Sequence, residues 1–343
     1  MRKLLNTLYI TNPDAYISRE GEQIAIRLDG SKIFQIPIHN VEGIVSFGYC
    51  GASPALLGLC AERGVTVTFL TEHGKYLASL SGPISGNILL RKEQYRIADD
   101  SKRRIVICNN FITAKILNSR AVLMRAVRDN ENLRNKTNFR IVIDKLARQA
   151  GKAQNACNED ELRGIEGDAA KLYFGNFNSL ILSQKDGFYF NGRSRRPPLD
   201  NLNALLSFTY VLLMHEVKSA IETVGLDPAA GFLHKDRPGR HSLALDMMEE
   251  LRPYMADRFV LSLVNRKQIS SADFIKKENG AILMGDETRK KLLTEWQKRK
   301  KNDIKHPYTK EKISLGLLPY LQAQLMARFI RGDIDGYPPF IWR

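Results

Sequence analysis

The chain has 343 residues, of which 43% are hydrophobic, and this size and apolar content exclude a disordered protein and allow two domains with separate cores. Its 52 Lys and Arg residues against 37 Asp and Glu residues leave a formal net charge of +15, which indicates a polyanionic partner, although a merely basic soluble enzyme has the same balance. Since no apolar run approaches the roughly 18 residues of a membrane span, no membrane association is predicted.

The N-terminal part of the chain is predicted to be rich in strands. Runs of β-branched and aromatic residues are separated by turn signals that contain Gly, Pro and Asn, and the segment 23–28 alternates polar and apolar residues as a half-buried strand does. A helix is expected over 54–63, because Ser53 can cap its start and Gly64 can end it. These features predict a β-rich domain over residues 1–90.

The rest of the chain is predicted to be helical. The polar segment 91–100 is expected to be a linker, after which apolar residues recur at helical spacing, most clearly over 103–118 and 138–152. The long apolar segment 199–224 is expected to be a core helix. The predicted fold class is therefore α+β, with an N-terminal β-rich domain followed by a larger all-α domain over residues 101–343.

One acidic residue of the helical part stands among small residues. Glu166 lies between Gly164 and Gly167 and just before Ala169 and Ala170. Glycine inside a helix costs about 1 kcal/mol relative to alanine, so its presence indicates that another backbone approaches closely. A carboxylate on such a packed face needs a cation or hydrogen-bond donors. The hypothesis is a functional, cation-binding Glu166; the alternative is a structural pair with an arginine.

A second acidic segment follows a histidine and a short loop. If 242–252 forms a helix that Ser242 caps, Asp246, Glu249 and Glu250 share one face, because residues three or four apart stack on a helix. One imidazole together with carboxylates suits Mn²⁺ or Mg²⁺ better than zinc. The alternative is an amphipathic helix with a solvated acidic face beside an ordinary loop histidine, His234.

Three blocks of the sequence carry a family resemblance. They are Gly164-x-Glu166-Gly167-x-Ala169-Ala170-x-x-Tyr173-Phe174, then Arg196-Pro197-Pro198-Leu199-Asp200-x-x-Asn203-Ala204-Leu205-Leu206-Ser207-Phe208-x-Tyr210, then His234 through Pro253. In this order the blocks resemble the CRISPR-associated integrase family, whose members insert new spacers into a CRISPR array. The residues of these blocks are most similar to those of the type I-C branch.

The resemblance implies a catalytic, metal-binding set of residues in the helical domain. In the family a glutamate, a histidine and a further acid bind a divalent ion, and the motifs place these on Glu166, His234 and Glu249, with Asp246 as a further catalytic residue that lines the site. Glu250 is the main ambiguity for the third ligand. Glu249 is preferred because the family's acid lies three residues after the motif aspartate.

The implied reaction is transesterification, in which a 3′-hydroxyl of captured DNA attacks a phosphodiester of the CRISPR repeat. Bound Mn²⁺ or Mg²⁺ would activate the hydroxyl and screen the phosphate charge. A plain structure-specific nuclease and a non-catalytic nucleic-acid scaffold are the alternatives.

Basic residues are expected to contact the DNA. Four of them surround the acidic motif and four form a run near the C-terminus, although salt bridges with the acids and a solvated helix end are the alternative interpretations. The predicted DNA-binding residues are Lys235, Arg237, Arg240, Arg252, Lys298, Arg299, Lys300 and Lys301.

The expected partners are the protospacer and repeat DNA, a second copy of the chain, and a small protein. Inserting a spacer requires two strand transfers, so a homodimer through residues 1–90 is predicted. The resemblance adds a small ferredoxin-like Cas partner. Four cysteines without CxxC spacing predict reduced thiols in a cytoplasmic protein.

Overall fold

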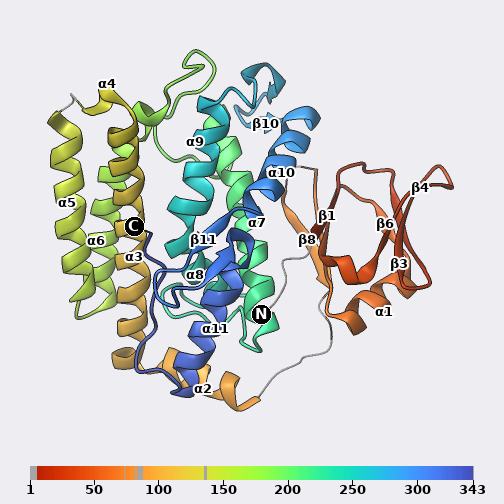
Figure 1. Cartoon of the computed structure of the whole chain (residues 1–343), viewed down its shortest axis with the longest axis horizontal. Coiled ribbons are helices and arrows are strands. Elements are labelled where there is room, and N and C mark those ends of the chain that lie inside the picture. The colour runs from red at the N-terminus through yellow and green to blue at the C-terminus, as the bar shows by residue number, and fades with distance from the viewer. Residues whose placement is uncertain (1–5, 73, 81, 83–87, 135–136, 343) are drawn as a thin grey trace. The chain divides into compact units, whose positions relative to one another are not determined.

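The computed structural model describes residues 6–72, 74–80, 82, 88–134 and 137–342. Within them the chain forms two compact units (Figure 1). The first comprises residues of 1–85, 285–302 and 314–317, and the second comprises residues of 86–284, 303–313 and 318–343. The predicted α+β class is confirmed, since strands dominate residues 6–80 and helices dominate the chain after residue 88.

The first unit contains two four-stranded sheets. In one sheet β1, β5 and β7 are parallel, and β8 pairs with β7 antiparallel. In the other, β2, β3 and β4 are antiparallel neighbours, and the short β6 pairs with β2. The strands are β1 (Asn6–Ile10), β2 (Tyr16–Glu20), β3 (Gln23–Leu28), β4 (Ser31–Pro37), β5 (Val41–Phe47), β6 (Gly51–Ala52), β7 (Thr66–Leu70) and β8 (Tyr76–Leu80).

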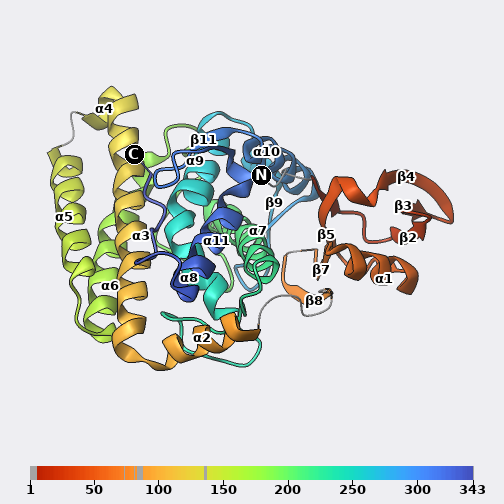
Figure 2. The same ribbon diagram turned by 60° about the horizontal axis from the view of Figure 1, so that its bottom comes forward.

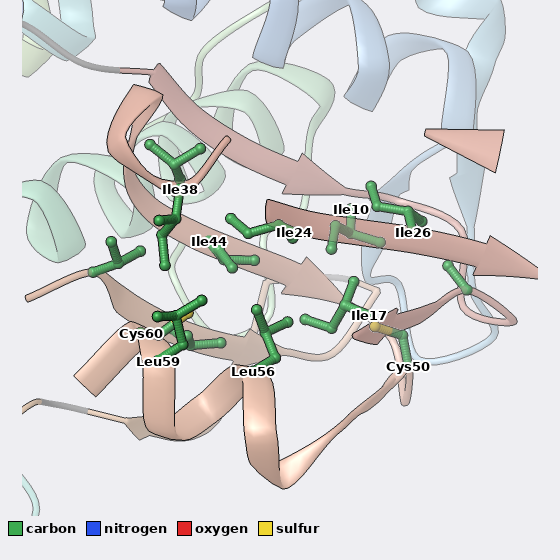
Figure 3. Packing of buried hydrophobic residues seen from close by; sticks show 14 residues of the cluster. Ile10, Ile17, Ile24, Ile26, Ile38, Ile44, Cys50, Leu56, Leu59 and Cys60 are labelled. Carbon is green, nitrogen blue, oxygen red and sulfur yellow. The ribbon is translucent and has the colours of Figure 1, made fainter. Parts of the chain in front are cut away.

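The core of this unit is formed by isoleucine side chains of both sheets and by one helix. The helix, α1 (Pro54–Arg63), begins where Ser53 Oγ accepts from Leu56 N and ends at Gly64, whose φ is 68°, so both predicted boundary signals are confirmed. Figure 3 shows Leu56, Leu59 and Cys60 of α1 directed toward the isoleucines of the strands. This burial of aliphatic side chains is what holds the two sheets and the helix together.

The helix α10 (Asp286–Lys300) belongs to the first unit, although the predicted helical domain included it. Trp296 is buried, Arg289 Nη1 donates to Glu72 O over 2.6 Å, and Lys300 Nζ donates to Thr7 Oγ1 over 3.2 Å. The apolar face of α10 thus packs against β1, a contact between distant parts of the chain that local periodicity does not indicate.

The second unit is mainly helical. Figures 1 and 2 both show α3, α5 and α6 side by side, and α8 packs against α3 and against α7. A short antiparallel pair, β9 with β10, and a second two-stranded sheet, β11 with β12, accompany the helices. The elements are α2 (Ile88–Asp99), α3 (Ser101–Asp129), α4 (Glu131–Arg134), α5 (Thr137–Gln154), α6 (Glu159–Gly175), α7 (Asn201–Thr223), α8 (Ser242–Arg252), α9 (Arg258–Asn265), β9 (Phe274–Lys276), β10 (Ile282–Met284), β11 (Asp303–Lys305), β12 (Lys312–Ser314) and α11 (Leu318–Arg331).

The segment 91–100, predicted to be a linker, is instead mostly helix α2. Leu90 and Ile97 are buried, and the buried Gln94 amide donates to the backbone oxygens of Asp227 and Ala230, each over 2.8 Å. The polar residues that suggested a linker lie on the outer side of this helix. Gln94 is the exception, since it is buried and fully used in hydrogen bonds.

The helix α7 is the long core helix that the sequence predicts. Asp200 caps it by accepting from Asn203 N over 2.7 Å. By length and composition α7 could cross a membrane, but 67% of its most apolar window is buried inside the fold. Its apolar side chains are therefore used in packing against α8 and α11.

Candidate functional site

Glu166 lies near the middle of α6, and its side chain is 28% exposed. The neighbouring glycines do not act as predicted: a Cβ atom added to Gly164 or Gly167 would meet nothing within 4 Å. No other backbone approaches them, so the prediction of a close approach was wrong. The glycines instead leave the surface beside Glu166 open to solvent.

Lys115 of α3 joins the two motif glutamates, a role that the sequence interpretation missed. Its Nζ atom donates to Glu166 Oε1 in a short hydrogen bond and lies 2.8 Å from Glu249 Oε2. The Lys115 side chain is only 10% exposed. The available signal was a single lysine within the apolar stretch Phe111–Ile116, where a charge has to find a buried partner.

Glu249 of α8 is held as a carboxylate by two cations. Burial alone would raise its pKa, but the charges of Arg252 and Lys115 outweigh that effect and lower the pKa to about 2. Arg252 Nη1 donates to Glu249 Oε1 over 3.2 Å, and Arg252 Nη2 lies 3.2 Å from Oε2. Although Oε2 has these two charged neighbours, no hydrogen bond of good geometry reaches it, so this oxygen keeps capacity for a further ligand.

His234 is fixed by Asp246, which is fully buried. Asp246 Oδ2 accepts from the backbone N–H groups of Phe232 (2.6 Å) and Leu233 (2.9 Å), and Oδ1 accepts from His234 N (3.0 Å). The ring Nδ1 of His234 lies 2.5 Å from the same Oδ1. Ser242, expected to cap α8, is instead its first residue, and its hydroxyl donates to Lys235 O.

This arrangement gives Asp246 a different place from the one predicted. Both of its oxygens are used by donors of the His234 loop, so it orients the loop and does not line the site with free lone pairs. Because the three backbone groups can only donate, the carboxylate acts as acceptor, and His234 Nδ1 carries the proton in this contact. The other ring nitrogen, Nε2, is the one left for a ligand.

Glu250 points away from Glu249 and toward the C-terminal segment. Its Oε1 accepts from Gln322 Nε2 over 2.9 Å and from the hydroxyl of Tyr337, and its Oε2 accepts from Phe340 N over 2.9 Å. Burial raises the pKa of Glu250 to about 7 in spite of these donors. The geometry therefore brings Glu249 to Glu166 and sends Glu250 into the core.

Arg252 packs against a buried cluster that consists of Tyr210, Tyr173 and Asp257. The guanidinium carbon of Arg252 lies 4.9 Å from the ring centre of Tyr210, and the hydroxyls of Tyr210 and Tyr173 donate to Asp257. Asp257 belongs to a π-helical turn, η3 (Pro253–Asp257), that follows α8. Pro253 ends the α-helical bonding because it lacks an N–H group, and the wider turn directs Asp257 inward.

The side chains present fit a hard divalent cation. Within the described part of the chain, no three His, Cys, Asp or Glu side chains are close enough together to hold a metal ion, and the ammonium of Lys115 stands between the two glutamates. The donor set nevertheless consists of two carboxylates and one imidazole, and Glu249 Oε2 lacks a directed hydrogen bond. His234 is close enough to Glu249 for its protonated form to lower the pKa of that carboxyl.

The predicted DNA-binding residues of the second unit divide into two groups. Lys235 and Arg237 are exposed and Arg240 is half-buried, in the loop between His234 and α8. Arg252 is buried and paired with Glu249. The structure thus shows the acid-neutralising pair that was the alternative interpretation for Arg252, and its burial does not favour the predicted direct DNA contact.

The basic run of the first unit is not a uniform patch. Lys298 is exposed and pairs with Glu295 over 2.8 Å, and Lys301 is exposed. Arg299 is partly buried, and Lys300 is buried with its ammonium bonded to Thr7. Since a helix presents successive residues to different sides, half of the predicted contacts turn inward with the apolar face of α10.

Comparisons with known proteins agree with this architecture. A family model described as CRISPR associated protein Cas1 matches residues 8–298. The chain is 51% identical to a CRISPR-associated endonuclease Cas1 of Chlorobaculum tepidum over 343 residues, which covers 100% of both chains.

Solved structures have the same fold. A Cas1 protein from Thermotoga maritima has a TM-score of 0.81 at 25% identity, covering 95% of this chain and 97% of that one. A casposase bound to integration product has a TM-score of 0.85 at 22% identity, covering 99% and 95%. A Cas6-RT-Cas1–Cas2 complex contains a chain with a TM-score of 0.82 at 21% identity, covering 100% of this chain and 36% of that one. The chain belongs to the Cas1 family of CRISPR-associated endonucleases.

Proposed function

We propose that this chain is a metal-dependent DNA integrase and endonuclease that inserts spacer DNA into a CRISPR array by attack of a 3′-hydroxyl on a phosphodiester. The observation that carries the proposal is the pair of carboxylates, Glu166 and Glu249, that α6 and α8 bring to one ammonium group. Family membership supports the endonuclease class. The bound metal and the joining reaction are proposed in addition to that class.

Glu166, Glu249 and His234 would hold Mn²⁺ or Mg²⁺. When bound, such an ion would make the attacking hydroxyl more acidic and screen the charge that gathers on the phosphate. Glu249 is ready for this role because its pKa of about 2 keeps it ionised at any physiological pH. Hard oxygen ligands with one imidazole suit these ions.

The other residues of the site act on these three. Asp246 engages Nδ1 of His234, which leaves Nε2 for a ligand, and it fixes the loop through three backbone N–H groups. Arg252 fixes the Glu249 side chain from the buried side. Lys235 and Arg237, exposed on the loop that follows His234, would contact DNA phosphates next to the reacting one.

The partners are proposed from the reaction and from similar proteins. Because one site joins one DNA end, a homodimer would supply the two strand transfers that insertion of a spacer requires. A casposase of the same fold is bound to integration product, and another chain of this fold is part of a complex with Cas2. A small ferredoxin-like Cas partner would bridge two dimers. The residues of the three motif blocks support the type I-C branch. The four free cysteines support a cytoplasmic location.

A joining assay tests this function. The protein, with its small Cas partner and Mn²⁺, is incubated with a short labelled duplex and a supercoiled plasmid that carries a CRISPR repeat. The expected product is a covalent joint between the label and the plasmid, lost when the duplex ends in a 3′-deoxy sugar and lost in Glu166→Gln and Glu249→Gln. If only shortened strands appear, the protein is a structure-specific nuclease; DNA binding without any reaction favours a scaffold.

A further inference from the structure

Lys115 lies where the two motif carboxylates converge. Its ammonium bonds to Glu166 Oε1 and stands 2.8 Å from Glu249 Oε2, so one cation bridges α6 and α8 from α3. Of the two carboxylates, Arg252 pairs with that of Glu249. The position between the two carboxylates, which is the position that a shared cation needs, is therefore taken by a side chain of the protein itself.

The two motif glutamates are matched by two cations in direct ion pairs. Glu166 and Glu249 contribute two negative charges, and Lys115 and Arg252 contribute two positive charges. A divalent cation bound to the same two carboxylates would stand beside the Lys115 ammonium in a mostly buried place, which is costly because desolvated like charges repel strongly. The Lys115 ammonium and a divalent ion would therefore compete for the same two carboxylates, and entry of the ion favours displacement of the ammonium.

The surroundings decide where the ammonium can go. On the inner side, the cavity lined by Lys115, Glu166, Arg252 and Asp257 has a volume of about 10 Å³, which is room for no more than one water. The outer side is open at Glu166, whose side chain is 28% exposed next to two glycines that meet no neighbour. The flexible four-carbon stem of a lysine allows its head to swing outward.

We propose that Lys115 is an internal counter-cation of Glu166 and Glu249, which exchanges with the divalent ion and then pairs with a phosphate of the bound DNA. This inference rests on the proposed metal site and assigns a role to a residue outside the metal-binding set. It has a thermodynamic consequence. The DNA phosphate accepts the displaced ammonium, so DNA and metal strengthen each other's binding by the same factor.

Metal binding by a lysine variant tests the exchange. Lys115→Met keeps the length of the side chain and removes the competing charge, so Mn²⁺ measured by titration calorimetry without DNA is expected to bind about tenfold more tightly than to the natural protein. Lys102→Met, an exposed lysine on the same helix, is the matched control and should leave Mn²⁺ affinity unchanged. Equal or weaker Mn²⁺ binding by Lys115→Met overturns the proposal.

The coupling to DNA is measured in the same titrations. A short duplex should raise the Mn²⁺ affinity of the natural protein, and this gain should be absent in Lys115→Met because the ammonium that pairs with the phosphate is gone. If the gain is the same in both proteins, pairing of Lys115 with the phosphate is disproved.

A measurement on the natural protein covers the case in which Lys115→Met fails to fold. Amine acetylation followed by mass spectrometry should label Lys115 slowly without metal, faster with Mn²⁺, and slowly again once DNA is added. Labelling that does not respond to Mn²⁺ overturns the exchange.

The glutamate variants separate this inference from the function on which it rests. If Glu166→Gln and Glu249→Gln bind Mn²⁺ as the natural protein does, the proposed metal site is wrong. If both lose Mn²⁺ binding while Lys115→Met matches the natural protein, the metal site holds and only the role of Lys115 is wrong.

Discussion

Glu249 and Glu250 are adjacent in α8, yet their carboxyl groups have opposite properties. Glu249 faces Lys115 and Arg252, whose charges outweigh the effect of burial and hold its pKa at about 2. Glu250 faces Tyr337, Gln322 and the backbone of Phe340, and burial raises its pKa to about 7. The difference comes from the neighbours: charged groups favour the ionised form far more strongly than neutral donors do.

The first prediction concerns the pH dependence of stability. Glu250 binds its proton more tightly in the folded protein than in the unfolded chain, so protonation stabilises the fold. This contribution to stability is complete below pH 4.5, the ordinary pKa of a glutamate, decreases as the pH rises and is lost as the pH passes about 7. The gap between these two values corresponds to about 3 kcal/mol. Denaturant unfolding across this pH range should follow the decline in the natural protein and show a much smaller decline in Glu250→Gln; equal slopes would contradict the assignment.

The second prediction tests Asp246 as a positioning residue. Asp246→Asn should replace an acceptor by a donor facing backbone N–H groups, at a cost of about 1 to 3 kcal/mol in the free energy of unfolding. Hydrogen exchange at residues 232–234 should accelerate, and joining should fall about as far as in His234→Ala. Asp236→Asn, an exposed aspartate of the same loop, is the control and should change neither. Unchanged exchange in Asp246→Asn would show that the carboxylate does not hold the loop.

The third prediction uses three glycines. Gly164→Ala and Gly167→Ala add a Cβ to open space inside a helix, so each should stabilise the protein by about 0.5 to 1 kcal/mol. Gly231→Ala should destabilise it, because the new Cβ would lie 2.6 Å from Ser242 Cβ and 2.9 Å from Asp246 Oδ2. Thermal unfolding distinguishes the signs. Loss of DNA joining in a stabilised Gly164 or Gly167 variant would mean that DNA approaches this surface closely.

These residues also show how far a sequence can be interpreted. The boundaries of α1 follow from Ser53 and Gly64, because capping involves residues a few positions apart. Helical spacing also predicted that Asp246, Glu249 and Glu250 share a face, and this is wrong for Glu250, whose carboxyl turns to Gln322, Tyr337 and Phe340. The boundaries of α1 and the α+β class were therefore predicted correctly.

Long-range contacts were not predictable in this way. Lys115 meets Glu249 across 134 positions of the chain, as the numbers of the two residues show, and no spacing rule connects them. The partners of Asp246 are backbone N–H groups, which every residue except proline has, so the residue types give no signal. The placement of α10 depends on Glu72 and Thr7, both far from it in sequence.

The fourth prediction distinguishes phosphate contacts from buried charges. The logarithm of the DNA-binding constant should fall linearly with the logarithm of the salt concentration, with a slope of about −0.9 per phosphate contact. Arg237→Ala and Lys235→Ala, exposed beside the site, should each reduce that slope by about one contact. Arg252→Met should leave the slope unchanged and destabilise the fold by about 3 to 5 kcal/mol, because Glu249 loses a buried partner. An Arg252 variant that is stable but has a reduced slope would restore Arg252 as a DNA contact.

The last prediction concerns assembly through the first unit. Ile33 and Phe34 of β4 expose about half of their side chains, at 56% and 46%, although strand residues of this kind are usually covered. The strand lies at the edge of its sheet, and exposed apolar edges favour pairing with another copy. Light scattering should therefore report twice the chain mass of 38.9 kDa.

The variant for this test has to leave the first unit folded. Deletion of residues 1–90 is unsuitable, because α10 would lose the strand against which its apolar face packs. The double substitution Ile33→Asp with Phe34→Asp adds charge to an exposed edge and should give a monomer of unchanged thermal stability. Ile275→Asp, an equally exposed isoleucine of the second unit at 54%, is the control and should remain dimeric. If the natural protein is a monomer, the two strand transfers require another arrangement of the chain. If the dimer survives the β4 substitutions, its interface lies elsewhere.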